Sequence, residues 1–329
     1  MAYLHEYKET FELDRFIIYG AKVTQLSVLS EEESGVKVLD ERLPKIRLEF
    51  ETNGVAETTS KDFDAVFVAN GHYALPSVPH LDGSEKYQGR IMHSVEYDSP
   101  ECFVGETVLC VGSQASGSDL AREISRHALH VYLSDSNAKV VETRGNVTCV
   151  PRTTAVDPDG CVVFASDCGV RAKVDTIIFC TGYDYHFPFI NTRSNLELSV
   201  VPGERRVTPL YKQLWHADQP NLCFVGLPHS VVPFPLFELQ VEAFVQQMLL
   251  GGDMIPSKAE REEKAQRDAV SGGANKTGRV ENTHYLGSAS WDYCRDLAVM
   301  AHSYDEDMEH YIATNRVRSR FCFLCVVLY

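Results

Sequence analysis

A glycine-containing turn between a strand and a helix is the stretch of this sequence best suited to chemistry. Gly112-Ser113-Gln114-Ala115-Ser116-Gly117 follows the apolar run Thr107–Val111, and Leu120, Ile124 and Ala128 then recur every four residues, as in an amphipathic helix. Backbone N–H groups of such a turn and the N-terminus of its helix can hold a pyrophosphate. Gln114 replaces the middle glycine of the dinucleotide motif. The pattern predicts a dinucleotide site, with a plain strand–helix turn as the alternative.

An acid at the end of the next strand bears on which dinucleotide binds. The run His130–Leu133 is followed by Ser134-Asp135-Ser136. A carboxylate here accepts hydrogen bonds from a ribose 2′-hydroxyl and favours NADH, whereas an arginine would favour the 2′-phosphate of NADPH. The nearest basic residue that follows is Lys139, so the pattern alone favours NADH, unless Asp135 is only a turn residue.

Two buried strands share one pattern. Phe63–His72 aligns with Val174–Tyr183: in both, an aspartate precedes an apolar block, which ends in Asn70-Gly71-His72 or in Thr181-Gly182-Tyr183. A small or polar residue followed by glycine suits a place where the backbone approaches a ligand closely. The match predicts a duplicated architecture, and two unrelated buried strands are the alternative.

The sequence does not favour covalent or metal catalysis. His93 and Ser94 are adjacent and so seldom face each other, and no acid is placed to orient the histidine, which predicts a packing or hydrogen-bonding role for His93. The CxxC pair Cys322–Cys325 lies in an apolar stretch without a second pair, which argues against zinc. We expect no protein nucleophile and no metal site.

The whole chain is acidic and long enough for two domains. It has 329 residues, with 31 Lys and Arg against 46 Asp and Glu, and a formal net charge of −15, which argues against nucleic acid as a partner. No apolar run is long enough to span a bilayer, and the N-terminus lacks the apolar core of a signal peptide, so we expect a cytoplasmic protein without a transmembrane segment. Short β-like runs at Phe16–Tyr19, Val23–Val28, Val36–Leu39 and Arg47–Glu51 predict a β-meander.

Taken together, these motifs resemble those of the flavin-containing monooxygenase family, in its glucosinolate S-oxygenase-like branch. Residues Tyr87–Tyr97 are similar to the family's F-x-G-x-x-x-H-S-x-x-[YF] fingerprint, with Tyr87 in place of the leading Phe. Asn70–Tyr73 and Phe179–Tyr183 resemble its two Ala-Thr-Gly-type linkers, and Gly112–Gly117 resembles its NADPH-binding loop. Later blocks of similarity are Pro209–Tyr211, Gly226–Pro228, Val232–Gln240 and Arg279–Ala301.

The resemblance implies an α/β fold with two dinucleotide-binding, Rossmann-like domains and β-meanders. Residues 1–100 and 184–329 would be the remainder of an FAD-binding domain, truncated at its N-terminus, and residues 101–183 an inserted NADP-binding domain. Gly112–Gly117 would cradle the NADP pyrophosphate, and Asn70, Gly71, His72, Thr181 and Gly182 would lie near the cofactors. The helix opening near Pro235–Gln240 would point toward the flavin, which adds Gln240 to the expected cofactor-binding residues.

The implied activity is that of a flavoprotein oxidoreductase. NADPH reduces FAD, the reduced flavin reacts with O2 to form a C4a-hydroperoxyflavin, and its terminal oxygen passes to a soft nucleophile. The substrate would be a small-molecule sulfide or amine, as in an N,N-dimethylaniline-type or S-oxygenating monooxygenase.

The sequence also departs from the family pattern. No strand–glycine turn–helix for the FAD pyrophosphate precedes Gly71, the family's early active-site asparagine has no counterpart, and Ser136 stands where an arginine for the NADP phosphate is expected. The alternative is therefore an inactive truncated fragment or pseudoenzyme that at most binds a nicotinamide nucleotide. On this basis the isolated chain is expected to be colourless and inactive.

Overall fold

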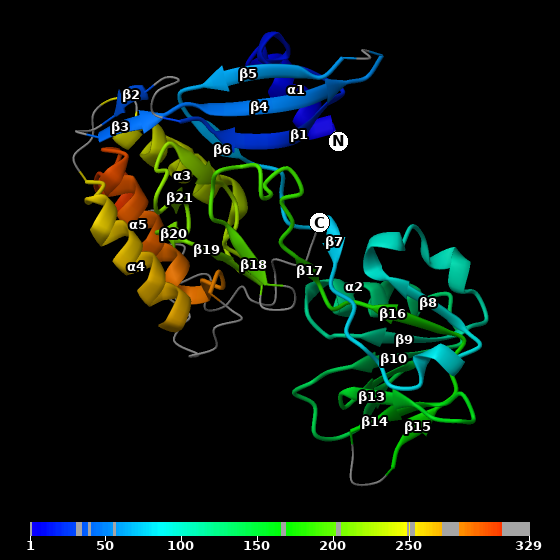
Figure 1. Ribbon diagram of the computed structural model, residues 1–329. Helices are drawn as coiled ribbons and strands as arrows, with labels where there is room; N and C mark the ends of the chain where they lie inside the picture. Colours follow the sequence, from blue (N-terminus) through cyan, green and yellow to red (C-terminus); the bar gives the residue numbers. More distant parts are fainter. Residues whose placement is uncertain are drawn as a thin grey trace. The chain divides into compact units, whose positions relative to one another are not determined.

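The computed structural model describes residues 2–30, 35–38, 41–54, 57–165, 169–201, 205–248, 250, 254–271 and 283–310. These residues form two compact units (Figure 1). The first unit contains the described residues up to Gly71 and from His186 onward, and the second contains His72–Tyr185. Residues 72–100, which the sequence assigns to the FAD-binding remainder, thus belong to the second unit.

The second unit is built on a six-stranded sheet in the order β11-β12-β10-β9-β16-β8. Strands β12, β10, β9, β16 and β8 are parallel to one another, and the edge strand β11 pairs with β12 in the antiparallel direction. Its strands are β8 (Arg90–His93), β9 (Thr107–Val111), β10 (His130–Ser134), β11 (Glu142–Arg144), β12 (Val147–Val150) and β16 (Thr176–Phe179).

The central strands β9 and β16 are buried on both faces. Neighbouring side chains of a strand point to opposite faces, and other elements cover each face. On β9, Val108 and Cys110 pack against α2 (Ala115–Ile124) and η4 (Pro100–Phe103), whereas Leu109 packs toward a three-stranded antiparallel sheet. That sheet comprises β13 (Thr153–Val156), β14 (Val162–Phe164) and β15 (Arg171–Ala172). The unit's remaining elements are β7 (Leu75–Pro76), η2 (Ser84–Lys86), η3 (Ser94–Glu96) and β17 (Tyr183–Asp184).

The first unit combines an antiparallel meander with a smaller mixed sheet. The meander has the order β1-β4-β5, with β1 (Ala21–Val28), β4 (Ile46–Thr52) and β5 (Thr59–Phe63). The mixed sheet has the order β20-β21-β22-β6, with β6 (Val66–Val68) parallel to β22 (Leu222–Phe224). The other strands of the mixed sheet are β20 (Leu210–Tyr211) and β21 (Trp215–His216). Two separate hairpins complete the described strands of this unit. One pairs β2 (Gly35–Val38) with β3 (Glu41–Pro44), and the other pairs β18 (Ser199–Val201) with β19 (Arg206–Thr208).

Helices complete the first unit. Leu236, Leu239, Ala243 and Phe244 give α3 an apolar stripe at helical spacing, and it packs on α5 around the buried Trp215. The helices are α1 (Ala2–Thr10), η1 (Leu13–Phe16), α3 (Pro233–Met248), α4 (Lys258–Ser271), η6 (Gly287–Ala289) and α5 (Ser290–Met300).

The predicted meander is confirmed in part, with two corrections. Val23–Val28 and Arg47–Glu51 lie in β1 and β4, which pair in the meander. Val36–Val38 forms strand β2, but β2 pairs with β3 in a separate hairpin and not in the meander, and Leu39 is outside the described residues. The strand predicted at Phe16–Tyr19 is wrong, because Leu13–Phe16 form a 3-10 helix and the following residues form no strand. Ile17 and Ile18 are exposed, so their β-branched side chains have no sheet to pack on.

Candidate functional site

The turn after β9 requires glycine at both of its ends. Gly112 has a φ of 104°, and a Cβ on it would lie 2.7 Å from the carbonyl oxygen of Cys180. A Cβ on Gly117 would lie 1.7 Å from the carbonyl oxygen of Gly112. The two glycines therefore let α2 start directly against the ends of β9 and β16.

Neighbouring strand ends hold this turn. Gly112 N–H donates to the carbonyl of Ser134 at the end of β10 (3.0 Å), and Cys180 N–H donates to the carbonyl of Val111 (2.8 Å). The turn thus lies at the carboxyl edge of three parallel strands, which is where nucleotides bind in open α/β sheets.

The N-terminus of α2 is suited to an anion. Gln114 is the N-cap residue, is exposed and makes no side-chain capping bond, so the N–H groups of Ala115, Ser116 and Gly117 have no acceptor within the helix. The first turn carries no acidic residue. Ser118 stabilises the loop, since its hydroxyl donates to the Ser113 carbonyl (2.6 Å). These N–H groups and the helix dipole favour a phosphate here.

Asp135 acts as a turn residue in this structure. Its Oδ1 accepts a hydrogen bond from Asn137 N–H (2.8 Å), and its own N–H donates to the carbonyl of Val150 (2.9 Å). The sequence allows Asp135 to be either a ribose-binding acid or a turn residue, and these two hydrogen bonds show that it caps the turn.

Thr181 and Gly182 follow β16 and are held by the backbone around β7. The Thr181 hydroxyl donates to the Ser77 carbonyl (2.5 Å), and Gly182, with a φ of 79°, accepts from Ser77 N–H (2.9 Å). The conformation at this glycine is left-handed, which explains the residue type.

His93 fixes the same glycine. Its Nδ1 accepts from Val95 N–H (3.2 Å), so Nε2 carries the proton and donates to the Gly182 carbonyl (3.0 Å). Burial lowers the pKa of His93, and the bond to the Gly182 carbonyl opposes that shift. The predicted hydrogen-bonding role of His93 is confirmed, but its partner at the end of β16 was not foreseen.

Asn70 and Gly71 occupy the matching place in the first unit, at the end of β6. The Asn70 side chain donates to the His186 carbonyl (3.1 Å), and Gly71 has a φ of 72°. His72 begins the second unit, where its ring packs against those of Tyr73 (centroids 4.2 Å apart) and Tyr185 (5.4 Å).

The two strand ends confirm the predicted duplication and also show how the units differ. Both β6 and β16 lie in parallel pairs and end in a polar residue and a left-handed glycine. β16 has a parallel partner on each side, β8 and β9, whereas among the described residues β6 is paired with β22 alone.

Gln240 is an internal brace. It is fully buried, its Oε1 accepts from Gly226 N–H (2.9 Å), and its Nε2 donates to the Tyr293 hydroxyl (3.1 Å). Tyr293 in turn donates to the Lys212 carbonyl (2.8 Å). The amide thereby ties α3 and α5 to the turn after β22, and its hydrogen-bonding groups are used within the first unit.

The N-terminus of α3 offers fewer donors than that of α2. The helix begins at Pro233, and Pro235 also lies in its first turn, so two of the first backbone nitrogens carry no hydrogen. Proline suits a helix start but removes donors that an anion could use.

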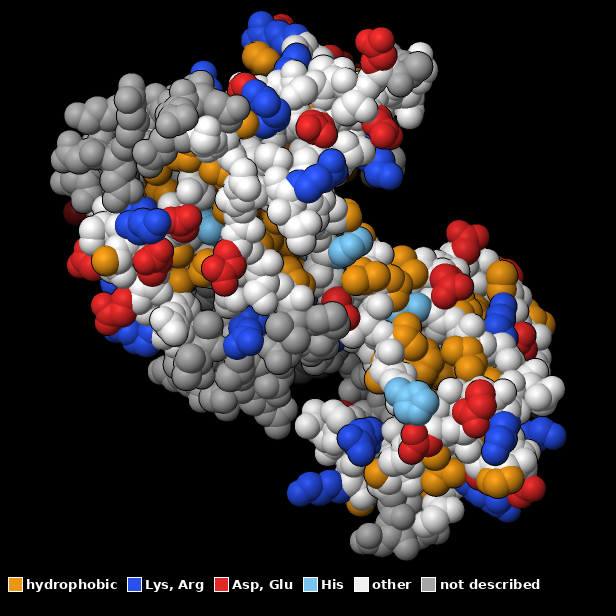
Figure 2. Space-filling view, viewed as in Figure 1, with side chains coloured by type: hydrophobic (Ala, Val, Ile, Leu, Met, Phe, Trp, Pro, Cys, Tyr) orange, Lys and Arg blue, Asp and Glu red, His pale blue; other side chains and the backbone are white. Residues whose placement is uncertain are grey.

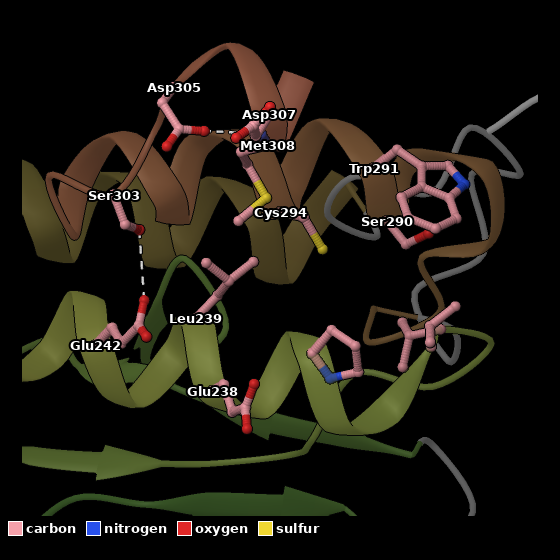
Figure 3. Close-up of a pocket in the computed structure, with 13 residues that line it drawn as sticks. Glu238, Leu239, Glu242, Ser290, Trp291, Cys294, Ser303, Asp305, Asp307 and Met308 are labelled. Carbon is pink, nitrogen blue, oxygen red and sulfur yellow. Dashed lines mark hydrogen bonds between the residues drawn. The ribbon is translucent and has the colours of Figure 1, made fainter. Parts of the chain in front are cut away.

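A cavity of about 500 Å³ lies between α3 and α5 in the first unit (Figure 3). Leu239 and Cys294 face each other across it, and Glu238 and Glu242 lie on the α3 side. Its remaining lining residues are Val231, Val232, Pro235, Ser290, Trp291, Ser303, Asp305, Asp307 and Met308. Gln240 is not among them, and the cavity shares no residue with the turn after β9.

Two further observations bear on function class. Among the described residues, no helix is both long and apolar enough to cross a membrane, and no group of three His, Cys, Asp or Glu side chains could hold a metal ion. The pair Cys322–Cys325 lies outside the described residues.

Known proteins share this sequence and fold. The Flavin-binding monooxygenase-like family model matches residues 1–157 and 143–301. The flavin-containing monooxygenase FMO GS-OX-like 4 of Arabidopsis thaliana is 36% identical over 264 residues, covering 78% of this chain and 55% of that protein. FMO GS-OX1 of the same plant is 30% identical over 312 residues, covering 92% of this chain and 62% of that protein. The chain thus spans little more than half the length of these relatives.

Solved structures agree. The S-allyl-L-cysteine S-oxygenase of Allium sativum is 29% identical, with a TM-score of 0.80 over 96% of this chain and 70% of that one. Tmm of Pelagibacter sp. strain HTCC7211, at 20% identity and a TM-score of 0.68, shares the fold over 91% of this chain and 62% of that one. The family uses FAD and NADPH, and the parallel sheet with its glycine turn is the Rossmann-like part expected of it. The match over residues 1–301 shows that this chain belongs to the flavin-binding monooxygenase-like family.

Proposed function

We propose that this chain is the NADPH-binding domain and part of the FAD-binding domain of a monooxygenase that oxygenates a small-molecule sulfide or amine with NADPH and O2. The observation that carries the proposal is the turn Gly112–Gly117. A side chain on either glycine would collide with a backbone carbonyl, and the first N–H groups of α2 have no side-chain cap. Of these two substrate classes we favour a sulfide, because one structural relative is an S-allyl-L-cysteine S-oxygenase.

The second unit supplies what NADPH requires. Residues 112–117 would bind the pyrophosphate through backbone N–H groups, and Thr181 and Gly182 would present backbone at the neighbouring strand end. His93 would keep that end in place through the Gly182 carbonyl.

The first unit supplies less of what FAD requires. Asn70 and Gly71 occupy a strand end that suits a cofactor, and α3 begins after β22. Within the described ranges of this unit, no glycine turn resembles residues 112–117. The turn after β22 contains Gly226, but its N–H is bonded to Gln240, and α3 begins with Pro233 and Pro235, which lack donors. The flavin, when bound, supplies the oxygen-activating chemistry of the family, so this unit limits what the chain does by itself.

The test is to purify the chain, add FAD, desalt it, and record the visible spectrum while NADPH binding is measured by fluorescence. We expect NADPH to bind and the desalted protein to be colourless and unable to oxidise NADPH with a thioether present. A flavin band near one equivalent, with NADPH turnover, would show that the chain works as an oxygenase alone. Failure to bind NADPH would refute the proposed role of the turn.

A further inference from the structure

Three parallel strands of the second unit end side by side, and each is followed by a residue that bears on nucleotide binding. The turn Gly112–Gly117 follows β9, Asp135 follows β10, and Pro151-Arg152 follow β12. β10 pairs with both of its neighbours in register, Ser134 lying opposite Val111 and Val150. With the pyrophosphate at the first strand end, the adenosine ribose lies toward the second.

The buried Ser134 fixes the backbone on either side of Arg152. Its hydroxyl donates to the Pro151 carbonyl (3.2 Å) and accepts from Thr153 N–H (2.9 Å). The carbonyl of Arg152 itself accepts from Ala165 N–H (2.8 Å). The position of Arg152 beside the end of β10 is therefore determined by three hydrogen bonds.

The side chain of Arg152 is exposed and available. Among the described residues no hydrogen bond or ion pair engages its guanidinium, whereas Arg122 pairs with Asp119 (2.6 Å) and Arg144 with Glu142 (3.6 Å). Adjacent strands lie about 4.8 Å apart, a distance that an arginine side chain spans easily. A guanidinium binds a phosphate through two parallel N–H donors.

The site after β10 is poorly suited to a phosphate by itself. Asp135 is acidic and caps its own turn, and Ser136 and Asn137 are uncharged. The first basic residue of this loop is Lys139, four residues beyond Asp135. The strand next to β10 is β12, and Arg152 follows its end by two residues.

We propose that Arg152 binds the 2′-phosphate of NADPH, so that the preference for NADPH over NADH is set at the end of β12 and not by a residue following β10. This inference rests on the proposed binding of NADPH at the turn after β9.

Fluorescence titrations with NADPH and NADH, and competition by 2′,5′-ADP against 5′-AMP, test it on the full chain. For Arg152→Ala we expect the Kd for NADPH and for 2′,5′-ADP to rise at least tenfold, with the Kd for NADH and 5′-AMP unchanged. Arg152→Lys should recover part of the loss, because a single positive charge remains. Arg144→Ala, on the neighbouring edge strand β11, is the matched control and should leave all four constants unchanged.

The outcomes separate the two proposals. Equal weakening of NADPH and NADH by Arg152→Ala, or no weakening of either, would overturn the role of Arg152 while the proposed function stands. A wild-type chain that binds NADH more tightly than NADPH would overturn it as well. A wild-type chain that binds neither nucleotide would refute the proposed function and this inference with it. Thermal unfolding of each variant establishes that the exposed substitution has not changed the fold.

Discussion

At the residue scale, His93 shows how a side chain in a fingerprint motif can act through the backbone. It lies in the segment Tyr87–Tyr97 that resembles the family signature, yet both ring nitrogens bond to backbone groups, at Val95 and at Gly182. The adjacent Ser94 suggests a catalytic pair only when the sequence is read alone, because neither ring nitrogen of His93 is free to activate it. The histidine is better understood as the support of one strand end.

The buried, neutral state of His93 predicts a pH dependence of stability. Because its pKa is lowered in the folded protein, the unfolded chain binds the proton more tightly, so acid favours unfolding. The stabilisation is fully present above the unfolded pKa of about 6.5 and is lost as the pH falls through the folded-state pKa. Urea unfolding of the wild type between pH 7.5 and 5 should show this loss.

His93→Gln, which retains a donor for Gly182, should be less stable at pH 7.5 and should approach the wild type as the pH falls. His216 is also buried with a pKa lowered by burial, so it contributes a slope of the same sign in the other unit, and His216→Gln separates the two contributions. The exposed His80→Gln is the control. A difference between wild type and His93→Gln that is the same at every pH would contradict this account.

At the element scale, the junction of β9 with α2 is the part of the site that the sequence predicts best. The spacing of its two glycines and the spacing of apolar residues along the helix are local properties, so both can be recognised in the sequence without knowledge of the fold. The role of Asp135 depends on the loop that follows it, and that of Arg152 on which strand lies beside β10. Neither can be predicted from local sequence, because sheet order is a long-range property.

Gly117→Ala tests the strand–helix contact directly. In an open helix position this change would stabilise by about 1 kcal/mol, through helix propensity alone. Here the added Cβ would meet the Gly112 carbonyl oxygen at 1.7 Å, and two backbone segments cannot relieve the overlap by changing a rotamer. We expect a loss of about 3 kcal/mol in the free energy of unfolding, as in severe overpacking, together with loss of NADPH binding.

Gly145→Ala is the comparison for that experiment. Gly145 has a φ of 63° but open space around its Cβ position, so the substitution introduces backbone strain of about 1–2 kcal/mol without a steric contact. Gly117→Ala should be the more destabilising of the two, and it alone should abolish nucleotide binding. Stabilisation by Gly117→Ala would mean that the helix does not start against the strand as described.

At the scale of the whole molecule, the sequence predicted the duplication but not its consequences. Equal spacing of an aspartate, an apolar block and a glycine identified the two strands ending at Asn70 and Thr181. The positions of β8 and β22, which pair with those strands in the same direction, come only from the structure. Residues 72–100 belong with the second unit for this reason: β8 lies among them and pairs with β16.

Large apolar side chains also lie at the surface of both units (Figure 2). In the first unit, Tyr3, Leu4, Phe11 and Phe67 are each more than a third exposed, and in the second Tyr73 and Val104 are. Phe67 is the central residue of β6, so one of these exposed groups lies on a strand that, in the part of the chain that the structure describes, is paired on one side only.

That one-sided pairing has a kinetic consequence in hydrogen exchange. Val66 N–H donates to Asn221, and the Val68 carbonyl accepts from Val225, so both residues face β22 and the N–H of Phe67 between them faces the opposite edge. Ile178, at the matching position of β16, lies in a strand paired on both edges.

Amide exchange followed by NMR should therefore be at least about tenfold faster at Phe67 than at Ile178, since the N–H of Phe67 faces solvent at the open edge of β6 and can exchange without unfolding. Equal protection at the two amides would mean that another segment covers this edge. The exchange rates of these two amide protons therefore measure whether each of the two matching strands has a partner on both of its edges.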